Sequence, residues 1–366
     1  RADRALRPHL AKLPAVEVLN ILRLGVVEIV GLGAPAHAVV NDLVSICGST
    51  GQTRPYKGLI NAVLRKAVAD VSGKWDKSPV QMMPKWLRSP LREAYGNGTI
   101  MAIETAHMRG APVDLTVTAD PQTWAETLGG LVLPNGSVRL NDMGQISALS
   151  GFEDGKWWVQ DAAASWPAAW LALQAGETVL DVCAAPGGKT MQMALAGAEV
   201  TSLDISAKRM ERVAENLGRT KLEANLVVAN VLEWQDARQF DAVLLDAPCS
   251  ATGTIRRHPD LPFAKDGTGI TELIGLQAEM LVAAARRVKP GGRLVFCTCS
   301  LIPDEGEVHA ENFLNAHKDF VVDTSVPEGM EAEWRSEEGG YRLRPDFWAD
   351  RGGMDGFYII RMNRAP

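Results

Sequence analysis

Residues 180–190 read Leu-Asp-Val-Cys-Ala-Ala-Pro-Gly-Gly-Lys-Thr, so that a short β-rich run enters a glycine turn. Glycines allow a ligand to approach the backbone closely, and the N-terminus of a helix that follows such a turn favours negative charge. The turn lacks the G-x-G-x-x-G spacing of a dinucleotide-binding fingerprint. It is not a Walker phosphate loop either, because Cys183 stands where that motif opens with glycine. The stretch predicts a small-molecule site of another kind.

Outward from this turn, strand and helix patterns alternate from about residue 160 onward. Ser206 is expected to cap one helix, and another helix is expected over about residues 274–288, ending at Lys289-Pro290-Gly291-Gly292. This alternation predicts an α/β fold with a doubly wound parallel sheet, whose ligands bind beyond the carboxyl ends of the strands. The expected strands are residues 178–182, 199–204, 225–229, 242–245 and 293–299.

Two further parts precede this sheet. Residues 14–71 carry apolar side chains at helical spacing, as in Val18, Leu22 and Val26, and their polar residues are free to face a partner. Residues 75–158 are interrupted by prolines, and alternation at Val113 and Leu115 indicates a strand. We therefore expect an all-α domain over residues 1–74, a linker with a small α+β subdomain over 75–159, and the large α/β domain over 160–366.

Composition and charge limit the classes of protein. The chain has 366 residues, 46% of them hydrophobic, and a net charge of −6, which is unevenly placed. Residues 1–110 hold 15 Lys and Arg against 8 Asp and Glu, whereas the remainder holds 23 against 36. A basic segment on an acidic body fits an RNA partner, although a solvated helical surface gives a similar count.

The chain has neither an apolar run of the roughly 20 residues that span a membrane nor an opening signal peptide. We expect a soluble, cytoplasmic monomer without a membrane partner. Because the sequence does not open with Met, we expect it to begin inside a longer gene product.

The five cysteines argue against a disulfide framework, because their number is odd and their spacing irregular. The spacing of Cys297 and Cys299 does not fit zinc, so no metal is expected. Cys47 and Cys297 are interpreted as core residues. Cys249 and Cys299 stand in strand-like settings, Asp-Ala-Pro-Cys-Ser and Thr-Cys-Ser. They suggest covalent chemistry in which one thiol attacks a carbon and the other helps to undo the adduct.

Three segments, residues 181–190, 246–254 and 298–300, together closely resemble the RNA cytosine-C5 methyltransferases that use S-adenosylmethionine. The helical front, with Leu24-Gly25-Val26 and the run at residues 57–65, resembles the NusB fold. The combination of these methyltransferase segments with a NusB-like front points to the bacterial Sun/Fmu-type enzymes, which modify small-subunit (16S) ribosomal RNA. The resemblance implies a Rossmann-like methyltransferase sheet preceded by a NusB-like domain.

The resemblance also implies catalytic roles. Cytosine C5 is too weakly nucleophilic to accept a methyl group, so the thiolate of Cys299 is expected to add at C6 and to activate C5. Cys249 is expected to take part in release of the adduct. Asp246 is expected to contact the base edge near N3 and the exocyclic amine.

For the cofactor, S-adenosylmethionine, the resemblance implies a binding role for the glycine turn. Asp204 is expected at the ribose, although capping of the following helix is equally open from spacing. Asn230 stands where relatives often carry an Asp that accepts a hydrogen bond from the adenine amine. Asp246 is also expected to contribute to the cofactor site. Arg209 is better explained as a surface charge than as a partner of the methionine carboxylate. The residues of the turn are Cys183, Ala184, Ala185, Pro186, Gly187, Gly188 and Lys189.

The target base is inaccessible in a stacked helix, so we expect it in a loop or extruded. Arg256, Arg257 and His258 are the candidates for phosphate contacts. Core packing is the preferred interpretation of Trp157, Trp158, Trp166 and Trp170. Three alternatives stay open here: the same reaction on transfer RNA, a non-catalytic assembly factor that binds RNA, and a nicotinamide dehydrogenase, which the glycine spacing disfavours.

Overall fold

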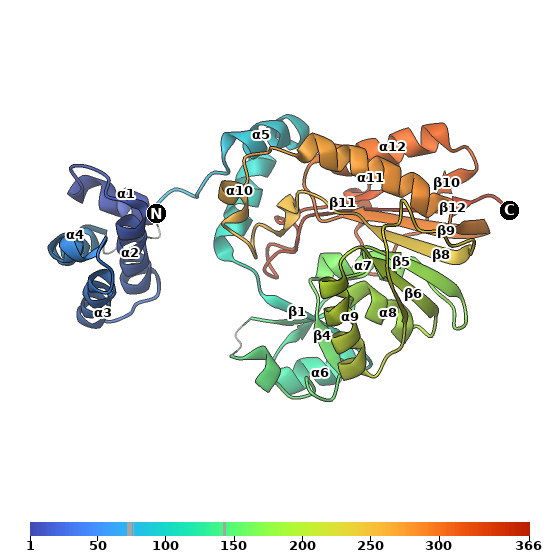
Figure 1. The fold of residues 1–366 in the computed structure, drawn as a ribbon, viewed down its shortest axis with the longest axis horizontal. Coiled ribbons are helices and arrows are strands. Elements are labelled where there is room, and N and C mark those ends of the chain that lie inside the picture. Colours follow the sequence, from blue (N-terminus) through green and yellow to red (C-terminus); the bar gives the residue numbers. More distant parts are fainter. Residues whose placement is uncertain (72–74, 76, 142–143) are drawn as a thin grey trace. The chain divides into compact units, whose positions relative to one another are not determined.

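The structure is a computed structural model that describes residues 1–71, 75, 77–141 and 144–366. It divides into two compact units, Arg1–Gln81 and Met82–Pro366, which are described separately (Figure 1). The domain boundary expected after residue 74 falls at residues 72–74, which lie outside the described residues. The finer boundary expected after residue 159 stays a prediction.

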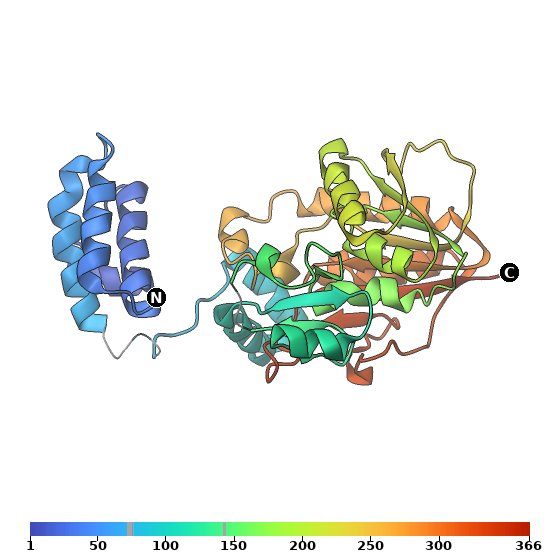
Figure 2. The ribbon, with the colours of Figure 1, turned by 90° about the horizontal axis from the view of Figure 1, so that it is seen from below.

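The N-terminal unit is entirely helical, as predicted. Helices α2, α3 and α4 run alongside one another (Figure 2) and bury one apolar stripe each, as in Leu22, Leu43 and Leu64. Gly25 allows α2 to approach its neighbours, since a Cβ there would lie 2.7 Å from Leu43 and 2.8 Å from Leu64. The helices are α1 (Ala2–Leu6), α2 (Val16–Val26), α3 (Ala36–Gly48) and α4 (Lys57–Val71).

The larger unit is built on an eight-stranded sheet with the order β10-β12-β9-β8-β5-β6-β7, and β11 pairs with β12. Neighbours from β9 to β7 are parallel, whereas β12 is antiparallel to β9, β10 and β11. The doubly wound α/β fold is thus confirmed. The strands are β5 (Thr178–Val182), β6 (Glu199–Asp204), β7 (Asn225–Val228), β8 (Phe240–Asp246), β9 (Val288–Thr298), β10 (Phe320–Val322), β11 (Tyr341–Leu343) and β12 (Phe357–Arg364).

Side chains that alternate along the strands pack into two hydrophobic cores, one on each face of the sheet. On β8, Ala242 and Leu244 face the core that includes α7 and α8, whereas Val243 and Leu245 face the core beneath α11 and α12 (Figure 1). The first face also carries α9, which Ser206 caps by accepting from the amide of Arg209. The helices are α7 (Ala162–Trp170), α8 (Gly188–Leu195), α9 (Ala207–Thr220), α10 (Leu261–Ala264), α11 (Ile270–Ala285) and α12 (Glu307–Ala316).

The chain reverses its winding direction at β5, which lies between β6 and β8. A doubly wound sheet opens a crevice at this point, beyond the carboxyl ends of its strands. Here these ends carry Val182, Asp204, Asp246 and Thr298. The fold therefore assembles the three predicted motifs at one edge of the sheet.

A small antiparallel sheet, ordered β2-β3-β1-β4, precedes the large one in the chain. Arg139 on β3 and Asp114 on β1 form a fully buried ion pair, with Nε 2.6 Å from Oδ1. Arg139 Nη1 also donates to the carbonyls of Arg351 and Gly353, so this pair ties the small sheet to the C-terminal part of the unit. The elements are β1 (Val113–Val117), α6 (Pro121–Leu128), β2 (Leu131–Val132), β3 (Val138–Leu140) and β4 (Trp157–Val159).

Two elements differ from the sequence-based expectation. Helix α5 (Lys85–Arg109) continues through Pro90 and kinks at Gly96, where a linker was expected. Its Tyr95 hydroxyl donates to the carbonyl of Leu301 at 2.7 Å, so tertiary packing supports it. The segment Lys289–Gly292 was expected to end a helix but lies inside β9, because an irregular pairing with β8 extends that strand back to Val288.

We expect Arg139→Met to lower the free energy of unfolding of the larger unit by about 3–5 kcal/mol, because Asp114 becomes an uncompensated buried charge. Urea unfolding followed by tryptophan fluorescence measures this, since of the ten tryptophans only Trp75 lies outside this unit. The matched control is Arg238→Met, which breaks an ion pair with Asp236 in which Arg238 is 52% exposed. That change should cost about 1 kcal/mol or less. Equal costs for the two variants would contradict the anchoring role of Arg139.

Candidate active site

Two adjoining cavities lie beyond the carboxyl ends of the parallel strands. One, of about 400 Å³, is lined by Asp204 and Asn230. The other, of about 490 Å³, is lined by Gln160, Arg257 and Phe357. The two cavities share four lining residues, which form a common wall: Cys183, Ala185, Asp246 and Cys299.

The glycine turn forms part of this wall. Cys183 adopts the left-handed conformation with a φ of 64°, which is uncommon for a residue other than glycine. Gly187 has a φ of 102°, and a Cβ there would lie 3.1 Å from Val213, so glycine is required. Of the seven turn residues named from the sequence, Gly187 alone lines neither cavity. Its contribution is to direct the chain from β5 into α8.

Asp204 is 1% exposed, and both of its carboxylate oxygens accept hydrogen bonds from the chain. Oδ1 accepts from the amide of Ser206 at 2.9 Å, and Oδ2 accepts from the amide of Ala185 at 3.3 Å. Arg209 pairs with the same carboxylate at 3.2 Å and donates to the carbonyl of Ala185. Asp204 therefore joins β6, the glycine turn and the start of α9, while it still lines the smaller cavity.

Asn230 lines the smaller cavity as well. Its side-chain oxygen, which was expected to accept from an adenine amine, accepts from the amide of Leu232 at 3.1 Å. A carbonyl oxygen has two lone pairs, and the amide nitrogen of Asn230 can donate. The side chain thus keeps hydrogen-bonding capacity for a ligand.

Asp246 is the most strongly held group of the shared wall. Its Oδ2 lies 2.7 Å from the ammonium of Lys189, and its Oδ1 accepts from the Cys297 thiol at 3.7 Å. Burial alone would lower the pKa of Lys189, but the charge of Asp246 raises it, so the ammonium stays charged. Lys189 also lies over the ring of Phe357 at 5.3 Å. A cation is therefore fixed directly behind the predicted base-binding carboxylate.

The thiols of Cys249 and Cys299 are in contact, with their sulfur atoms 3.4 Å apart. The contact with Cys299 and burial together raise the pKa of Cys249 well above its usual value. Burial also raises the pKa of Cys183 and of Cys297. These three thiols are therefore neutral near pH 7. Cys299 is the predicted nucleophile, and it lines both cavities.

The backbone around Cys299 is tightly fixed. Its carbonyl accepts from the amide of Gly253 at 2.9 Å, and the carbonyl of Gly253 accepts from the amide of Gly356 at 2.8 Å. A Cβ at position 253 would lie 1.9 Å from the Gly356 oxygen, so no other residue fits. The glycine in the Ala-Thr-Gly-Thr segment is thereby explained by close packing of three backbone segments.

Sequence reasoning missed Glu305, which is fully buried beneath the two cysteine segments. Its carboxylate accepts from the amide and hydroxyl of Ser250, the hydroxyl of Ser300 and the amide group of Gln277. In the sequence Pro-Asp-Glu-Gly this residue reads as part of a solvated turn. Only the tertiary fold indicates that it is buried.

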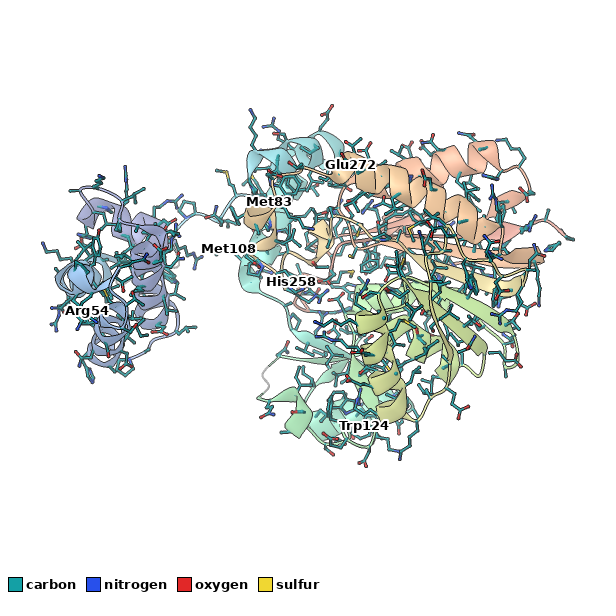
Figure 3. The ribbon with its side chains drawn as sticks, in the orientation of Figure 1. Arg54, Met83, Met108, Trp124, His258 and Glu272 are labelled. Atoms are coloured by element: carbon teal, nitrogen blue, oxygen red, sulfur yellow. The ribbon has the colours of Figure 1, made fainter. Side chains whose placement is uncertain are left out.

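The three candidates for phosphate contacts are placed differently. Arg256 is wrong as a candidate, because its side chain is fully buried between Asp161 and Asp355. Arg257 pairs with Asp355 at 2.5 Å, keeps 41% of its side chain exposed and lines the larger cavity. His258 is exposed beside α10 (Figure 3).

The four tryptophans named above are all buried, which confirms core packing as their main role. Trp166 packs against Trp348, with ring centroids 5.3 Å apart. Trp158 also lines the larger cavity, where its ring nitrogen donates to Gln160 at 2.9 Å.

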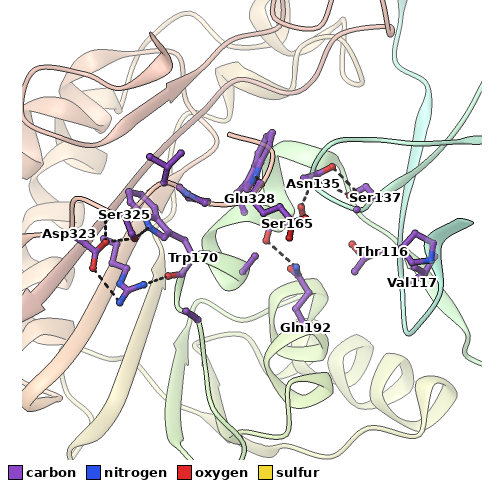
Figure 4. Close-up of a pocket in the computed structure, with 18 of the residues that line it drawn as sticks. Thr116, Val117, Asn135, Ser137, Ser165, Trp170, Gln192, Asp323, Ser325 and Glu328 are labelled. Atoms are coloured by element: carbon purple, nitrogen blue, oxygen red, sulfur yellow. Dashed lines mark hydrogen bonds and ion pairs between the residues drawn. The ribbon is translucent and has the colours of Figure 1, made fainter. Parts of the chain in front are cut away.

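A further cavity, of about 590 Å³, lies on the α7 face of the sheet, between β1, α7 and residues 323–328 (Figure 4). Its polar side chains mostly satisfy one another. Asn135 donates to Ser165 and Trp170 donates to Ser325, while Asp323 pairs with Arg361. Its lining includes none of the residues predicted for the active site.

Within the part of the chain that the structure describes, no helix is both long and apolar enough to cross a membrane. A doubly wound sheet with a ligand crevice at this turn and an antiparallel strand, β12, inserted beside β9 defines the class as a Rossmann-like, S-adenosylmethionine-dependent methyltransferase.

Comparison with known proteins narrows this class. A family model described as 16S rRNA methyltransferase RsmB/F matches residues 168–363, and a NusB family model matches residues 3–69. Ribosomal RNA small subunit methyltransferase B of Pasteurella multocida is 34% identical, covering 94% of this chain and 80% of its own length. The protein of the same name from Escherichia coli O157:H7 is 36% identical, over 88% of this chain and 79% of its own.

Among solved structures, a methyltransferase homolog protein from Pyrococcus horikoshii is 26% identical with a TM-score of 0.64, covering 77% of this chain and 95% of that chain. The chain belongs to the 16S rRNA methyltransferase RsmB/F family, and it carries a NusB family domain in front. It is an S-adenosylmethionine-dependent RNA methyltransferase, as the resemblance implied.

One buried carboxyl at this site gives a pH-dependent prediction. Asp181 is the penultimate residue of β5 and accepts from the Thr190 hydroxyl at 2.6 Å, while among the described residues its Oδ1 has no hydrogen-bond partner. Burial raises the pKa of Asp181 from 3.8 to about 7. The folded state thus favours the protonated carboxyl, so stability is lost progressively as pH rises from about 4 to about 7.

We expect Asp181→Asn, which cannot ionise, to gain thermal stability relative to the parent between pH 5 and pH 8. The difference in Tm between variant and parent, measured at both pH values without cofactor, checks this. Asp236→Asn is the control, because hydrogen bonds from Arg238 lower the pKa of Asp236 and that variant should show no such gain. A Tm difference for Asp181→Asn that does not change with pH would contradict the shift.

Proposed function

We propose that this enzyme transfers a methyl group from S-adenosylmethionine to C5 of a cytosine in small-subunit ribosomal RNA, through a covalent adduct between Cys299 and C6. One observation carries the proposal: the two cavities share a wall that holds Cys299 and Asp246. A reacting base in the larger cavity and a methyl donor in the smaller one would meet at this wall. The names of the curated relatives support ribosomal RNA as the substrate.

The smaller cavity fits the cofactor. Its apolar side chains, including Ile205, Val231 and Met280, suit an adenine ring, and Asp204 and Asn230 offer polar groups to a nucleoside. When bound, S-adenosylmethionine supplies an electrophilic methyl group. The turn residues of the shared wall, Cys183 and Ala185, are the groups of the chain that would fix its reactive end.

The thiol pair supports the covalent mechanism. Two sulfur atoms in contact cannot both carry a negative charge at low cost, and the raised pKa of Cys249 keeps that thiol neutral beside Cys299. Addition of the Cys299 thiolate forms the S–C6 bond and moves an electron pair to C5. After methylation, C5 loses its proton to a base and the S–C6 bond breaks, which restores the C5–C6 double bond and returns Cys299 as a thiolate. Cys249 lies beside the departing sulfur.

The ion pair behind the wall supports a polar role for Asp246. Its carboxylate, held by Lys189 and Cys297, is suited to accept from the exocyclic amine of cytosine. Addition at C6 places negative charge on the pyrimidine ring, and the buried ammonium of Lys189 stabilises charge of that sign. Both groups are already in position, so little reorganisation is needed during the reaction.

We expect Cys299→Ala to abolish methyl transfer, because the change removes the nucleophile that adds at C6. Cys249→Ala should instead accumulate protein covalently bound to RNA, because addition proceeds and release fails. Transfer of labelled methyl groups to unmodified 16S ribosomal RNA and denaturing gels measure the two effects. Cys47→Ala, which alters a buried cysteine of the N-terminal unit, is the matched control and should keep full activity.

Full activity of Cys299→Ala would contradict the proposed mechanism. The same assay run with unmodified transfer RNA separates the substrates, since preferential labelling of transfer RNA would replace ribosomal RNA in the proposal. A parent protein that binds RNA but never transfers methyl groups would identify a non-catalytic RNA-binding factor instead.

We propose that Arg257 contacts a phosphate of the target nucleotide from the rim of the larger cavity, held in place by Asp355. We expect Arg257→Ala to raise the KM for RNA about 5- to 30-fold, the loss of one charge-assisted contact, with a smaller effect on kcat. The slope of RNA affinity against salt should fall by about one. Arg238→Ala removes an exposed, Asp-paired arginine that lines neither cavity and should leave both quantities unchanged.

A further inference from the structure

We infer that Glu305 is a positioning residue that holds the Cys249 loop against Cys299 and thereby controls release of the covalent adduct. The inference rests on the proposed function, because it concerns the two thiols of that mechanism. Glu305 ends the short turn Pro303–Glu305 before α12, and its carboxylate accepts hydrogen bonds from both cysteine segments.

The contacts of Glu305 are divided between the two segments. Oε1 accepts from the amide of Ser250 at 2.8 Å and from Gln277 at 3.0 Å. Oε2 accepts from the hydroxyl of Ser250 at 2.5 Å and from the hydroxyl of Ser300 at 2.6 Å. Ser250 follows Cys249, and Ser300 follows Cys299. One buried carboxylate therefore clamps the residues that are next to both thiols.

The carboxylate form is required by this donor set. The Glu305 side chain is fully buried, and it acts as the acceptor in all four of these hydrogen bonds. A carboxylate offers about four lone-pair sites on two oxygens, whereas an amide offers two on one oxygen. Glutamine at this position would keep the shape of the side chain but could not accept from all four donors.

The two segments depend on this clamp to different extents. Cys299 directly follows β9, whose pairing with β12 continues to Thr298, and its carbonyl accepts from Gly253. Cys249 lies in a loop after β8 and has no such strand to hold it. The same carboxylate also anchors Gln277, whose side chain donates to the carbonyl of Pro248 at 2.8 Å. Loss of the clamp should therefore displace Cys249 more than Cys299.

This asymmetry gives the role a signature that a merely structural residue would lack. If Cys249 moves while Cys299 stays, addition to the base continues and release slows. Adduct between protein and RNA then accumulates, as it should in Cys249→Ala. General loosening of the fold would instead weaken cofactor binding and addition, so that no adduct would accumulate.

The experiment compares Glu305→Gln with a control variant, Glu104→Gln. Glu104 is also a buried carboxylate, but it pairs with Arg88 and is distant in sequence from both thiols. We expect Glu305→Gln to reduce turnover with 16S ribosomal RNA about tenfold, the order of a lost charge-assisted contact, and to raise the adduct fraction several-fold. Affinity for S-adenosylmethionine, measured by calorimetry, should change less than about threefold. Glu104→Gln should not raise the adduct fraction.

Two milder variants test the asymmetry even if Glu305→Gln folds poorly. Ser250→Ala removes the hydroxyl that links the Cys249 loop to Glu305, together with its contacts to the hydroxyls of Thr252 and Ser300, and should also accumulate adduct. Ser300→Ala removes the hydroxyl that links the Cys299 segment to Glu305 and that accepts from the amide of Ile302, and it should accumulate less adduct. Equal adduct levels in the two serine variants would contradict the unequal hold.

The outcomes separate this inference from the proposed function. If Cys249→Ala accumulates adduct but Glu305→Gln and Ser250→Ala do not, the positioning role is wrong and the proposed mechanism stands. If none of the three accumulates adduct, the release role of Cys249 fails and the positioning role fails with it. Loss of turnover in Glu305→Gln with weakened cofactor binding and no adduct would reduce Glu305 to a structural residue.

Discussion

The pairing of β8 with β9 is the constraint on which the site depends. Their parallel register places Asp246 opposite Cys297, so that the segments following both strands leave the sheet side by side. Cys249 and Cys299, 50 residues apart in the chain, thereby come into contact. A shift of this register by one residue would turn Asp246 and Cys297 to opposite faces of the sheet and would separate the carboxylate from the thiols. The chemistry of the wall is thus set by backbone hydrogen bonds.

The site also concentrates buried ionisable groups, which are costly to bury unless each is paired or hydrogen-bonded. Asp246 is paired with Lys189, and Glu305 receives four hydrogen bonds. Asp181 is left partly unsatisfied, and burial raises its pKa. The fold accepts this cost near the carboxyl ends of its central strands, where the proposed mechanism uses the fixed charges of Asp246 and Lys189.

Much of this arrangement could be predicted from the sequence. The glycine turn, the alternation of strands and helices and the order of the three motifs indicated the doubly wound sheet, and the resemblance indicated the methyltransferase class. Local pattern failed where tertiary contacts decide the outcome. Pro90 sits inside α5 because that helix packs against Leu301 and Ile302, and Lys289–Gly292 joins β9 because β8 lies beside it. Arg256 and Glu305 look solvated in the sequence, and only the fold encloses them among partners.

The buried ion pair of Arg139 and Asp114 has a consequence for how a folded RNA would enter the larger cavity. By donating also to the carbonyls of Arg351 and Gly353, Arg139 ties the small sheet to the segment that leads into β12 of the large sheet. These buried contacts oppose a separation of the two sheets as a way to open the larger cavity. Access to a stacked base would then require the RNA to unstack that nucleotide, and this cost favours strands that are already loosely stacked.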